Sequence, residues 1–551
     1  MLIVIAATLA VIPMLFFGNA WGHDFHLHLP RWMDAAQQFR EGIVFPRWAA
    51  GSNSGFGDPF FIFYPPLSWT LGATLGSILP WRMVPGAYVW LVVVLAGAAM
   101  WKCASDWLDP PDAVMASLLY AVNPYVLVMV YKRCSYGELL ASAFFPLLVW
   151  AAVRMGRNPT KTIFPLAIVF AAIWLADLPA ALVASYSLAL LLLCDSFIHR
   201  SLRPILYGAL AILTTFASLA FFLFPAAWER KWVCINLVLR PDWVPESNFL
   251  FARVKDLGML AFNTGVSFLA LILVATTAIA AVLTRRLRRE VPDVWRLLTV
   301  LGGVSAFLLF RPSSILWNIL PELRYVEFPW RWLSPLCVAG AVLTSSAVGQ
   351  TRRRAALRVI VALAIVAIGA GIVVHNAAWD SQHHHLKDLT AAIHSGAGYK
   401  LIEDAQWFRP LGSHPSKLPE LAPVIVPADA QDEKEISQQG VQLHVDLWSP
   451  ERKVFSVDSP RPLLLRIKLL AYPAWQARLN GKIVALETNQ ETGQMLLPVP
   501  AGFTRAEIMF VRTWDRTVGM AVSLTTILAL ILLMLVLRWR ERSARGHEAR
   551  F

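Results

Sequence analysis

Residues 162–194, TIFPLAIVFAAIWLADLPAALVASYSLALLLLC, contain two successive apolar runs separated by a single charged side chain. A helix that crosses the hydrocarbon core of a bilayer needs roughly 17–25 mostly apolar residues. The stretch therefore predicts membrane helices near 162–177 and 179–197. Similar runs recur along the 551-residue chain, which is 57% hydrophobic and 15% charged. These features predict a mainly α-helical, polytopic membrane protein with about twelve membrane-spanning helices.

The remaining apolar runs are separated by short loops. They predict membrane helices near 2–18, 83–101, 112–131, 138–154, 204–225, 258–284, 296–310, 333–350, 358–376 and 518–537. The apolar segment 65–79 is treated differently, because counting it as a crossing would place every later basic cluster on the outer side. We expect it to lie along the outer face or to dip into it.

The net charge of +13 comes from short basic clusters beside the apolar runs. They lie at Lys161, 199–200, 285–289, 352–354 and 538–550. Lys and Arg are enriched in cytoplasmic loops of membrane proteins, so both termini are expected in the cytoplasm of an inner-membrane protein. No nucleic-acid partner is expected, because the clusters do not share one soluble face.

This topology divides the chain into four parts. They are a transmembrane domain (1–377) with outer loops at 19–82, 226–257 and 311–332, a periplasmic domain (378–516), a last membrane helix (517–537) and a basic cytoplasmic tail (538–551). Within 378–516, Val441, Leu443, Val445 and Leu447 alternate with other residues, which indicates a half-buried strand.

Further strands in the outer domain are expected at 463–470, 475–479 and 506–512. Asn480-Gly481 predicts a tight hairpin turn. Together these segments predict a small antiparallel β-sandwich.

The first outer loop begins GHDFHLHLPRW (22–32). Pro30 suits the first turn of a helix, so an amphipathic interfacial helix is expected from about His28 to Glu41, with Asp24 in the turn before it. A carboxylate at the membrane surface is able to accept a proton from a sugar hydroxyl or to hold a cation. The alternative is that Asp24 only caps the helix.

Metal binding in this loop would use a divalent cation, Mg²⁺ or Mn²⁺. The candidate ligands are Asp24, His23, His26 and His28. Three histidines within six residues are not a metal signature, so no cofactor is assigned. The run His383-His384-His385 is interpreted as solvated surface, because consecutive histidines cannot all face one ion.

Arginines, glutamates and aromatic residues cluster in the outer loops and at outer helix ends. An outer-face arginine can hold a lipid phosphate by two hydrogen bonds, and a glutamate can orient it. Local Arg–Glu pairs and an aromatic interface belt are the alternative. The candidate substrate-binding residues are His28, Arg31, Arg47, Tyr64, Arg133, Glu138, Arg324, Glu327 and Arg331.

Several motifs occur in a fixed order: GHDFHLHLPRW, PRW, GFGDPFFIFYPPLSW, YKRCSYGELLASAFFPL, RYVEFPWRW and YPAWQARLNGK. In this order they resemble bacterial membrane proteins with the 6-pyruvoyl-tetrahydropterin synthase-related domain, which are similar to YfhO-like proteins. Nothing in the chain reproduces the zinc site of the soluble synthase, so pterin chemistry is not carried over.

The resemblance implies a GT-C-like architecture with a lipid-phosphate-linked sugar as donor. On that pattern Asp24 is the base or a metal ligand, Arg133 and Arg331 contact the donor phosphate, and Glu138 and Glu327 shape the cavity.

The resulting hypothesis is an inverting glycosyltransferase that uses a polyprenyl-phosphate-linked sugar. Its acceptor would be an envelope glycan or lipid on the outer face of the inner membrane. The β-sandwich, with Trp448 and Trp475, would bind the acceptor glycan or cover the cavity, and the alternative is that Trp475 belongs to the sandwich core. The alternative is a non-catalytic membrane protein that binds, transports or scaffolds lipid-linked glycans. The sequence leaves both open.

Overall fold

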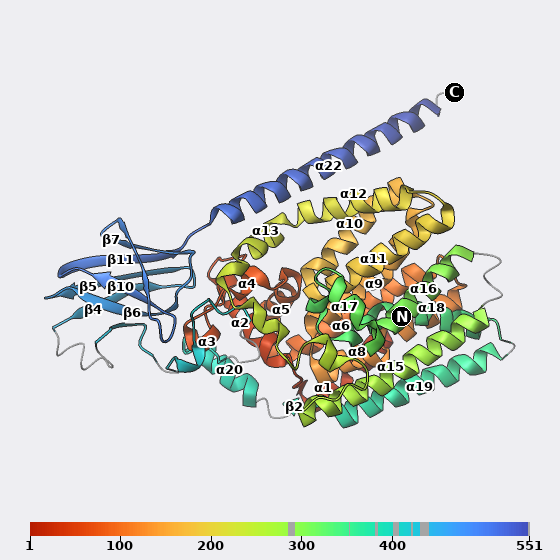
Figure 1. The fold of residues 1–551 in the computed structure, drawn as a ribbon, viewed down its shortest axis with the longest axis horizontal. Helices are drawn as coiled ribbons and strands as arrows, with labels where there is room; N and C mark the ends of the chain where they lie inside the picture. The colour runs from red at the N-terminus through yellow and green to blue at the C-terminus, as the bar shows by residue number, and fades with distance from the viewer. Residues whose placement is uncertain are drawn as a thin grey trace.

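The computed structural model describes residues 1–284, 292–351, 353–380, 384–400, 407–419, 422–429 and 440–548. Figure 1 shows a body of packed helices with a β-rich domain at one end, and a long last helix that starts beside this domain and runs back along the helical body. The basic run 285–289, Arg352 and His383 lie outside the described residues.

The helical body contains both long membrane helices and short connecting helices. The helices are α1 (Leu2–Phe17), α2 (Phe25–Arg40), α3 (Ser52–Gly55), α4 (Phe60–Phe63), α5 (Pro66–Ile78), α6 (Val84–Ala104), α7 (Pro110–Ala121), α8 (Pro124–Val128), α9 (Tyr136–Met155), α10 (Pro159–Ala176), α11 (Leu178–His199), α12 (Arg203–Ser218), α13 (Ala220–Glu229), α14 (Pro245–Asn248), α15 (Leu257–Leu283), α16 (Pro292–Leu308), α17 (Ser314–Ile319), α18 (Leu333–Gly349), α19 (Arg354–Asn376), α20 (His384–His394) and α22 (Trp514–Glu548). Short helical turns that matter for the site are η2 (Met129–Arg133), η3 (Arg230–Trp232), η4 (Ile235–Leu239), η7 (Leu323–Val326) and η8 (Pro329–Trp332).

Among the described residues, nine helical segments are long and apolar enough to cross a membrane, or up to eleven if two bent pairs count as spans. The bent pairs are α12 with α13, at 73°, and α16 with α17, at 95°. The remaining expected helix, α1, is shorter at 16 residues. The prediction of a polytopic, mainly α-helical membrane protein is confirmed.

The helix at the first outer loop differs from the prediction. α2 begins at Phe25, so Pro30 lies inside the helix and not in its first turn. The amide nitrogens of Leu27 and His28 donate to the carbonyl of Asp24, which starts the helix earlier. α2 is also largely buried against α5, so it is not an amphipathic surface helix. α5 itself has 13 residues, fewer than a crossing needs.

The C-terminal part forms an antiparallel β-sandwich, as predicted. One sheet has the order β3-β6-β10-β9 and the other β4-β5-β11-β7-β8. The strands are β3 (Ile425–Pro427), β4 (Gln442–Trp448), β5 (Arg452–Ser459), β6 (Leu463–Leu470), β7 (Trp475–Leu479), β8 (Lys482–Val484), β9 (Glu487–Thr488), β10 (Gln494–Val499) and β11 (Gly502–Phe510). A separate pair, β1 (Asn19–Ala20) and β2 (Trp379–Asp380), ties the first outer loop to the end of α19.

Details of the sandwich bear out some strand predictions and correct one. Asn480 and Gly481 both have positive φ, 46° and 82°, at the predicted turn between β7 and β8. In β4, however, Val445 and Leu447 are 37% and 40% exposed. β4 is an edge strand whose register shifts between these residues, so its regular alternation does not produce a buried face.

Side chains from the helical part of the chain pack against the sandwich. Trp48, from the first outer loop, is fully buried and meets the Trp475 ring edge-on at 5.5 Å. The carboxylate of Glu229 in α13 accepts hydrogen bonds from the Arg516 guanidinium at 2.7 and 2.8 Å. It also accepts one from the Tyr472 hydroxyl at 2.6 Å. Trp475 itself is buried against Trp48 and belongs to the sandwich core, as the alternative interpretation held.

Candidate functional site

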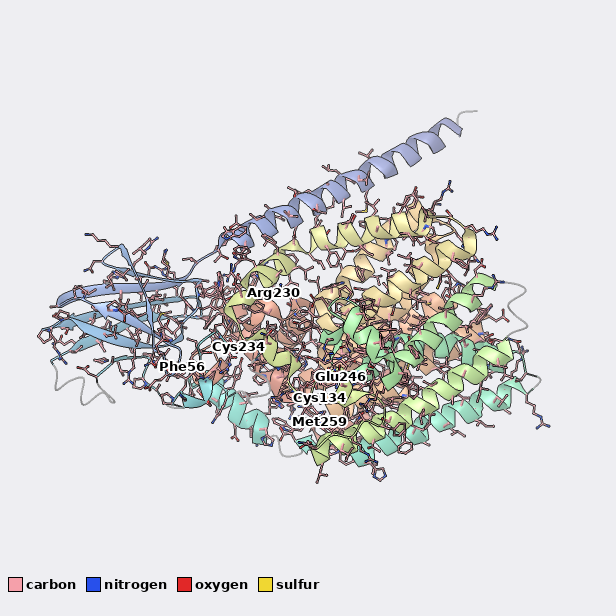
Figure 2. The ribbon with its side chains drawn as sticks, viewed as in Figure 1. Phe56, Cys134, Arg230, Cys234, Glu246 and Met259 are labelled. Carbon is pink, nitrogen blue, oxygen red and sulfur yellow. The ribbon has the colours of Figure 1, made fainter. Side chains whose placement is uncertain are left out.

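A cavity of about 1430 Å³ lies where the outer loops converge. Its lining includes residues from all three predicted loops and, on the side of the β-domain, Trp407, Phe408 and Leu411. Figure 2 locates two of the lining residues, Arg230 beyond α13 and Met259 in α15, together with Cys134 next to η2.

Asp24 is held in this cavity by a close approach of two backbone segments. The amide nitrogens of His23 and Asp24 donate to the carbonyls of Lys132 and Arg133, at 3.2 and 2.7 Å. A Cβ on Gly22 would lie 2.5 Å from the Lys132 carbonyl oxygen, so only glycine permits this contact. The π-helical turn η2 ends at Arg133, which places its side chain beside Asp24.

The Asp24 carboxylate is directed toward the cavity and not toward the helix start. It makes no capping hydrogen bond to the α2 backbone. Its Oδ2 lies 3.6 Å from an Arg133 guanidinium nitrogen, and the side chain remains 29% exposed. The capping alternative for Asp24 is therefore wrong, because its carboxylate contacts Arg133 and does not bond to the helix backbone.

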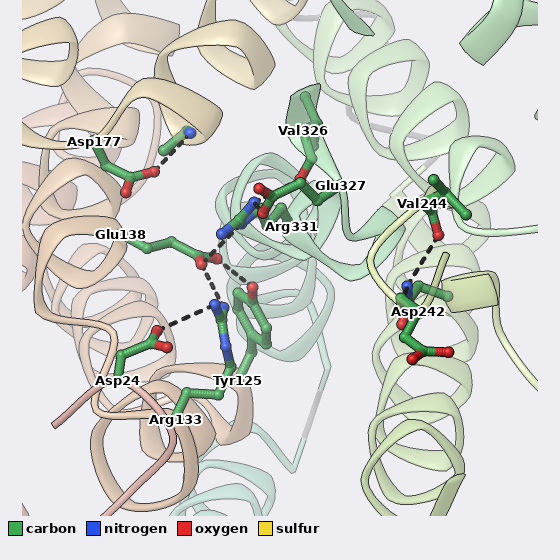
Figure 3. Close-up of polar contacts among 12 residues, drawn as sticks. Asp24, Tyr125, Arg133, Glu138, Asp177, Asp242, Val244, Val326, Glu327 and Arg331 are labelled. Carbon is green, nitrogen blue, oxygen red and sulfur yellow. Dashed lines mark hydrogen bonds and ion pairs between the residues drawn. The ribbon is translucent and has the colours of Figure 1, made fainter. Parts of the chain in front are cut away.

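A buried chain of ion pairs extends from Arg133 (Figure 3). Arg133 donates to Glu138 Oε2 at 2.5 Å, and Arg331 donates to the same oxygen at 3.2 Å. Arg331 also donates to Glu327 at 2.8 Å, while the Tyr125 hydroxyl donates to the other Glu138 oxygen. Glu138 is thus the junction of the chain. It does not line the cavity but lies behind the two arginines that do.

Glu327 is both strained and electrostatically unusual. Its backbone φ is +61°, a value that residues other than glycine rarely adopt. Burial raises the pKa of its carboxyl to about 7, although Arg331 opposes the shift. Glu327 therefore titrates near neutral pH.

Asp177 is a cavity residue that the sequence interpretation did not single out. Its Oδ1 accepts a hydrogen bond from the Ala180 amide at 2.8 Å, so it caps α11. Burial raises its pKa to about 6, and Arg331 opposes the shift. A lone acid between two membrane helices was the available signal. The loop 226–257 supplies further charged lining residues that were not identified: Arg230, Lys231, Arg240, Asp242 and Asp256.

The three histidines of the first outer loop line the cavity without forming a metal site. His28 is buried, which lowers its pKa to about 4, and burial also lowers the pKa of His23. Within the described parts of the chain, no three His, Cys, Asp or Glu side chains are placed to hold a metal ion. Asp24, His23, His26 and His28 therefore do not form a three-ligand cation site, and no step is assigned to a cation.

Four of the nine predicted substrate-binding residues, Arg31, Arg47, Glu138 and Arg324, lie outside the cavity lining, whereas His28, Tyr64, Arg133, Glu327 and Arg331 lie within it. Arg31 is buried and pairs with Asp58 at 3.8 Å. Arg47 lies over the Phe45 ring at 4.4 Å. Arg324 pairs at the surface with a glutamate, Glu246, at 2.7 Å. Each of these three arginines therefore contacts another side chain of the protein outside the cavity lining.

The fold and site define a multi-pass membrane protein with a large charged cavity and a β-sandwich beside it. No protein-family model and no curated protein matches the chain. Three solved membrane glycosyltransferases of the GT-C type are similar in fold. The apo structure of ArnT from Cupriavidus metallidurans is 14% identical with a TM-score of 0.44, over 71% of this chain and 69% of that one.

The other two similar structures are larger proteins. Arabinofuranosyltransferase AftD from Mycobacteria is 14% identical with a TM-score of 0.43, over 68% of this chain. The matched region is only 26% of the length of AftD. The oligosaccharyltransferase of Archaeoglobus fulgidus is 13% identical with a TM-score of 0.40, over 74% of this chain and 60% of that one. At these scores the similarity determines neither a substrate nor a reaction.

Proposed function

We propose that the chain is a GT-C-like glycosyltransferase of the bacterial inner membrane. It would transfer a sugar from a polyprenyl-phosphate-linked donor to an envelope glycan or lipid acceptor on the outer face, with both termini in the cytoplasm. Its proposed relation to the YfhO-like family rests on the order of its sequence motifs. The observation that carries the proposal is the partly exposed Asp24 carboxylate, oriented by Arg133, in a large cavity with apolar and charged walls.

The lining of the cavity suits a lipid-linked sugar. Leu178 and Leu182 of α11, together with Leu223 and Ala226 of α13, form an apolar part of the wall. An isoprenoid chain needs such a surface, because its transfer from water is favourable in proportion to the apolar area that is buried. The charged side chains elsewhere in the cavity suit a sugar and a phosphate.

The proposed reaction is a single displacement. Asp24 accepts the proton of an acceptor hydroxyl, whose oxygen forms a bond to the anomeric carbon of the sugar. The bond between that carbon and the phosphate oxygen breaks, and its electron pair leaves with the polyprenyl phosphate. The configuration of the anomeric carbon is inverted. Arg133 orients the base, and Glu138 fixes Arg133, so catalysis would rest on positioning and preorganised charge.

A comparison of envelope glycans tests the role of Asp24 without presupposing the sugar. A deletion strain would carry wild-type protein, Asp24→Asn protein or Asp106→Asn protein at equal membrane abundance. Asp106 is a matched control, since it is 23% exposed and pairs with Arg154 at 2.6 Å but does not line the cavity. We expect Asp24→Asn to lose the same saccharide mass as the deletion and Asp106→Asn to retain it.

The opposite result would favour the non-catalytic alternative. If Asp24→Asn restores the glycan as well as wild type while the empty deletion strain shows a defect, Asp24 is not the base. The chain would then be better described as a protein that binds, transports or scaffolds lipid-linked glycans.

A further inference from the structure

Among the charged side chains in the cavity and directly behind it, two groups have different surroundings. The first, here called the acid end, consists of Asp24, Arg133, Glu138, Glu327 and Arg331. Its two guanidinium groups share three carboxylate partners. Arg331 also donates to the Val326 carbonyl at 2.6 Å. The positive charge of this end is therefore already compensated within the protein.

The second group, here called the basic end, consists of Arg230 and Lys231. Both side chains are exposed and line the same cavity. Neither forms an ion pair with a carboxylate in the part of the chain that the structure describes. The Lys231 ammonium lies 3.5 Å from the centre of the Trp228 ring. Figure 2 shows Arg230 well separated from Cys134, the neighbour of Arg133 in the chain.

The backbone that carries the basic end is firmly anchored. The preceding residue, Glu229, is fully buried and receives two hydrogen bonds from Arg516 and one from Tyr472. Arg516 lies near the start of α22, and Tyr472 belongs to the β-domain. This three-way contact fixes η3 to two other parts of the molecule, so Arg230 and Lys231 project from a defined position.

An apolar surface leads directly to the basic end. Leu223, Ala226, Ala227 and Arg230 follow the helical spacing i, i+3, i+4 and i+7 and therefore share one face of α13 and its extension. All four line the cavity. A lipid chain that lies along this face would have its headgroup beside Arg230.

Stereochemistry argues against a donor phosphate beside Asp24 and Arg133. In an inverting displacement the attacking oxygen and the leaving oxygen lie on opposite sides of the anomeric carbon. Arg133 lies against the proposed base, at 3.6 Å from Asp24. A cation that contacts the base is poorly placed to receive the leaving phosphate, which must depart from the opposite side.

We infer that Arg230 and Lys231 bind the phosphate of the polyprenyl-linked donor and stabilise it as the leaving group. This inference rests on the proposed function and reassigns the role that the family resemblance gave to Arg133 and Arg331. The tail of the lipid lies along α13, and the arginines of the acid end position Asp24 instead of contacting the donor phosphate.

The test measures binding of undecaprenyl phosphate to the purified full-length protein in nanodiscs by native mass spectrometry. We expect the double variant Arg230→Gln/Lys231→Gln to bind at least about tenfold more weakly than wild type, because two charge-assisted contacts are lost. The control Arg253→Gln/Lys255→Gln removes the same charge from the same loop outside the cavity and should bind like wild type. The charge-preserving double variant Arg230→Lys/Lys231→Arg should restore most of the binding.

Two further lipids test whether the protein recognises the phosphate of undecaprenyl phosphate. Undecaprenol lacks the phosphate and should bind equally to wild type and to the Gln double variant. Phosphatidylglycerol should compete weakly. Equal competition by phosphatidylglycerol would show a general anionic-lipid contact and overturn the inference.

The remaining outcomes separate the inference from the proposed function. If wild type and the Gln double variant bind undecaprenyl phosphate equally, the phosphate lies elsewhere, and the inference fails while the proposed function stands. If wild type does not bind undecaprenyl phosphate, both the inference and the proposed donor class fail.

Discussion

The two ends of the cavity hold their charges in opposite ways. At the acid end Glu138 is 1% exposed and Arg133 is 5% exposed, and each charge has a partner within the protein. At the basic end Arg230 and Lys231 are exposed, and no described carboxylate pairs with them. Burial of a charge is costly unless it is paired, whereas an exposed charge remains hydrated at little cost. The acid end is therefore suited to hold Asp24 in a fixed position, and the basic end is suited to bind an anion.

The largest expected effect tests whether the acid end is an integrated structural unit. Glu138→Gln would leave two buried guanidinium groups without their shared carboxylate. Breaking one partner of a buried ion pair costs about 3–5 kcal/mol, so the free energy of unfolding should fall by about that amount in an SDS titration. Arg230→Gln, at the basic end, should change it by less than about 0.5 kcal/mol. Equal effects of the two variants would remove the distinction between the ends.

A second prediction concerns pH at the acid end. Burial raises the pKa of Glu327 from 4.5 to about 7, so the folded protein binds more protons than the unfolded chain between these values. The stabilising contribution is complete below the unfolded-state pKa and is lost as pH rises through the folded-state pKa. The loss is on the order of 3 kcal/mol.

Replacing Glu327 isolates this contribution from that of other acids. Glu327→Gln should flatten the decrease in unfolding free energy between pH 4.5 and about 7, measured by SDS titration at each pH. Asp177, which also has a raised pKa, remains in both proteins, and its charge is one cause of the raised pKa of Glu327. Glu322→Gln, five residues earlier and exposed, serves as the control and should keep the wild-type slope. An unchanged slope in Glu327→Gln would contradict the assignment.

The third prediction tests the close approach that places Asp24. Gly22→Ala would put a Cβ 2.5 Å from the Lys132 carbonyl oxygen and 2.8 Å from Cys134 Sγ. The backbone must shift, at a cost of about 1–3 kcal/mol, and glycan formation should decrease because Asp24 moves relative to Arg133. Gly86→Ala is the matched control, since its Cβ would meet nothing within 4 Å. Wild-type stability and glycan formation in Gly22→Ala would show that the contact is dispensable.

Much of the fold follows from local sequence patterns. Apolar runs determine the membrane helices, and Asn480-Gly481 determines the hairpin, because each signal acts through neighbouring residues. The start of α2 was misplaced because the Asp24 carbonyl, and not the position of Pro30, begins the helix. The exposed face of β4 depends on its edge position, which only the paired sheet reveals.

The site was predictable where a motif places residues next to the cavity, as for Asp24 and Arg133. The pairs Asp24–Arg133 and Glu138–Arg331 join segments that are distant in the chain, and local spacing does not indicate them. The sequence also could not distinguish a cation that has a carboxylate partner from one that does not. For this reason the basic end was overlooked.

The smallest expected effect concerns Arg324, which the sequence analysis named, like Arg331, as a candidate substrate-binding residue. Arg324 is 35% exposed and pairs with Glu246, itself 40% exposed, and exposed pairs contribute about 0–1 kcal/mol. Arg324→Gln should therefore lower the free energy of unfolding by less than about 1 kcal/mol in the SDS titration. Arg331→Gln, which disrupts the buried chain, should have a much larger effect. If Arg324→Gln instead weakened undecaprenyl phosphate binding as strongly as the loss of Arg230 and Lys231, phosphate recognition would extend outside the cavity. In that case the contrast between paired and unpaired cations would not identify the ligand site.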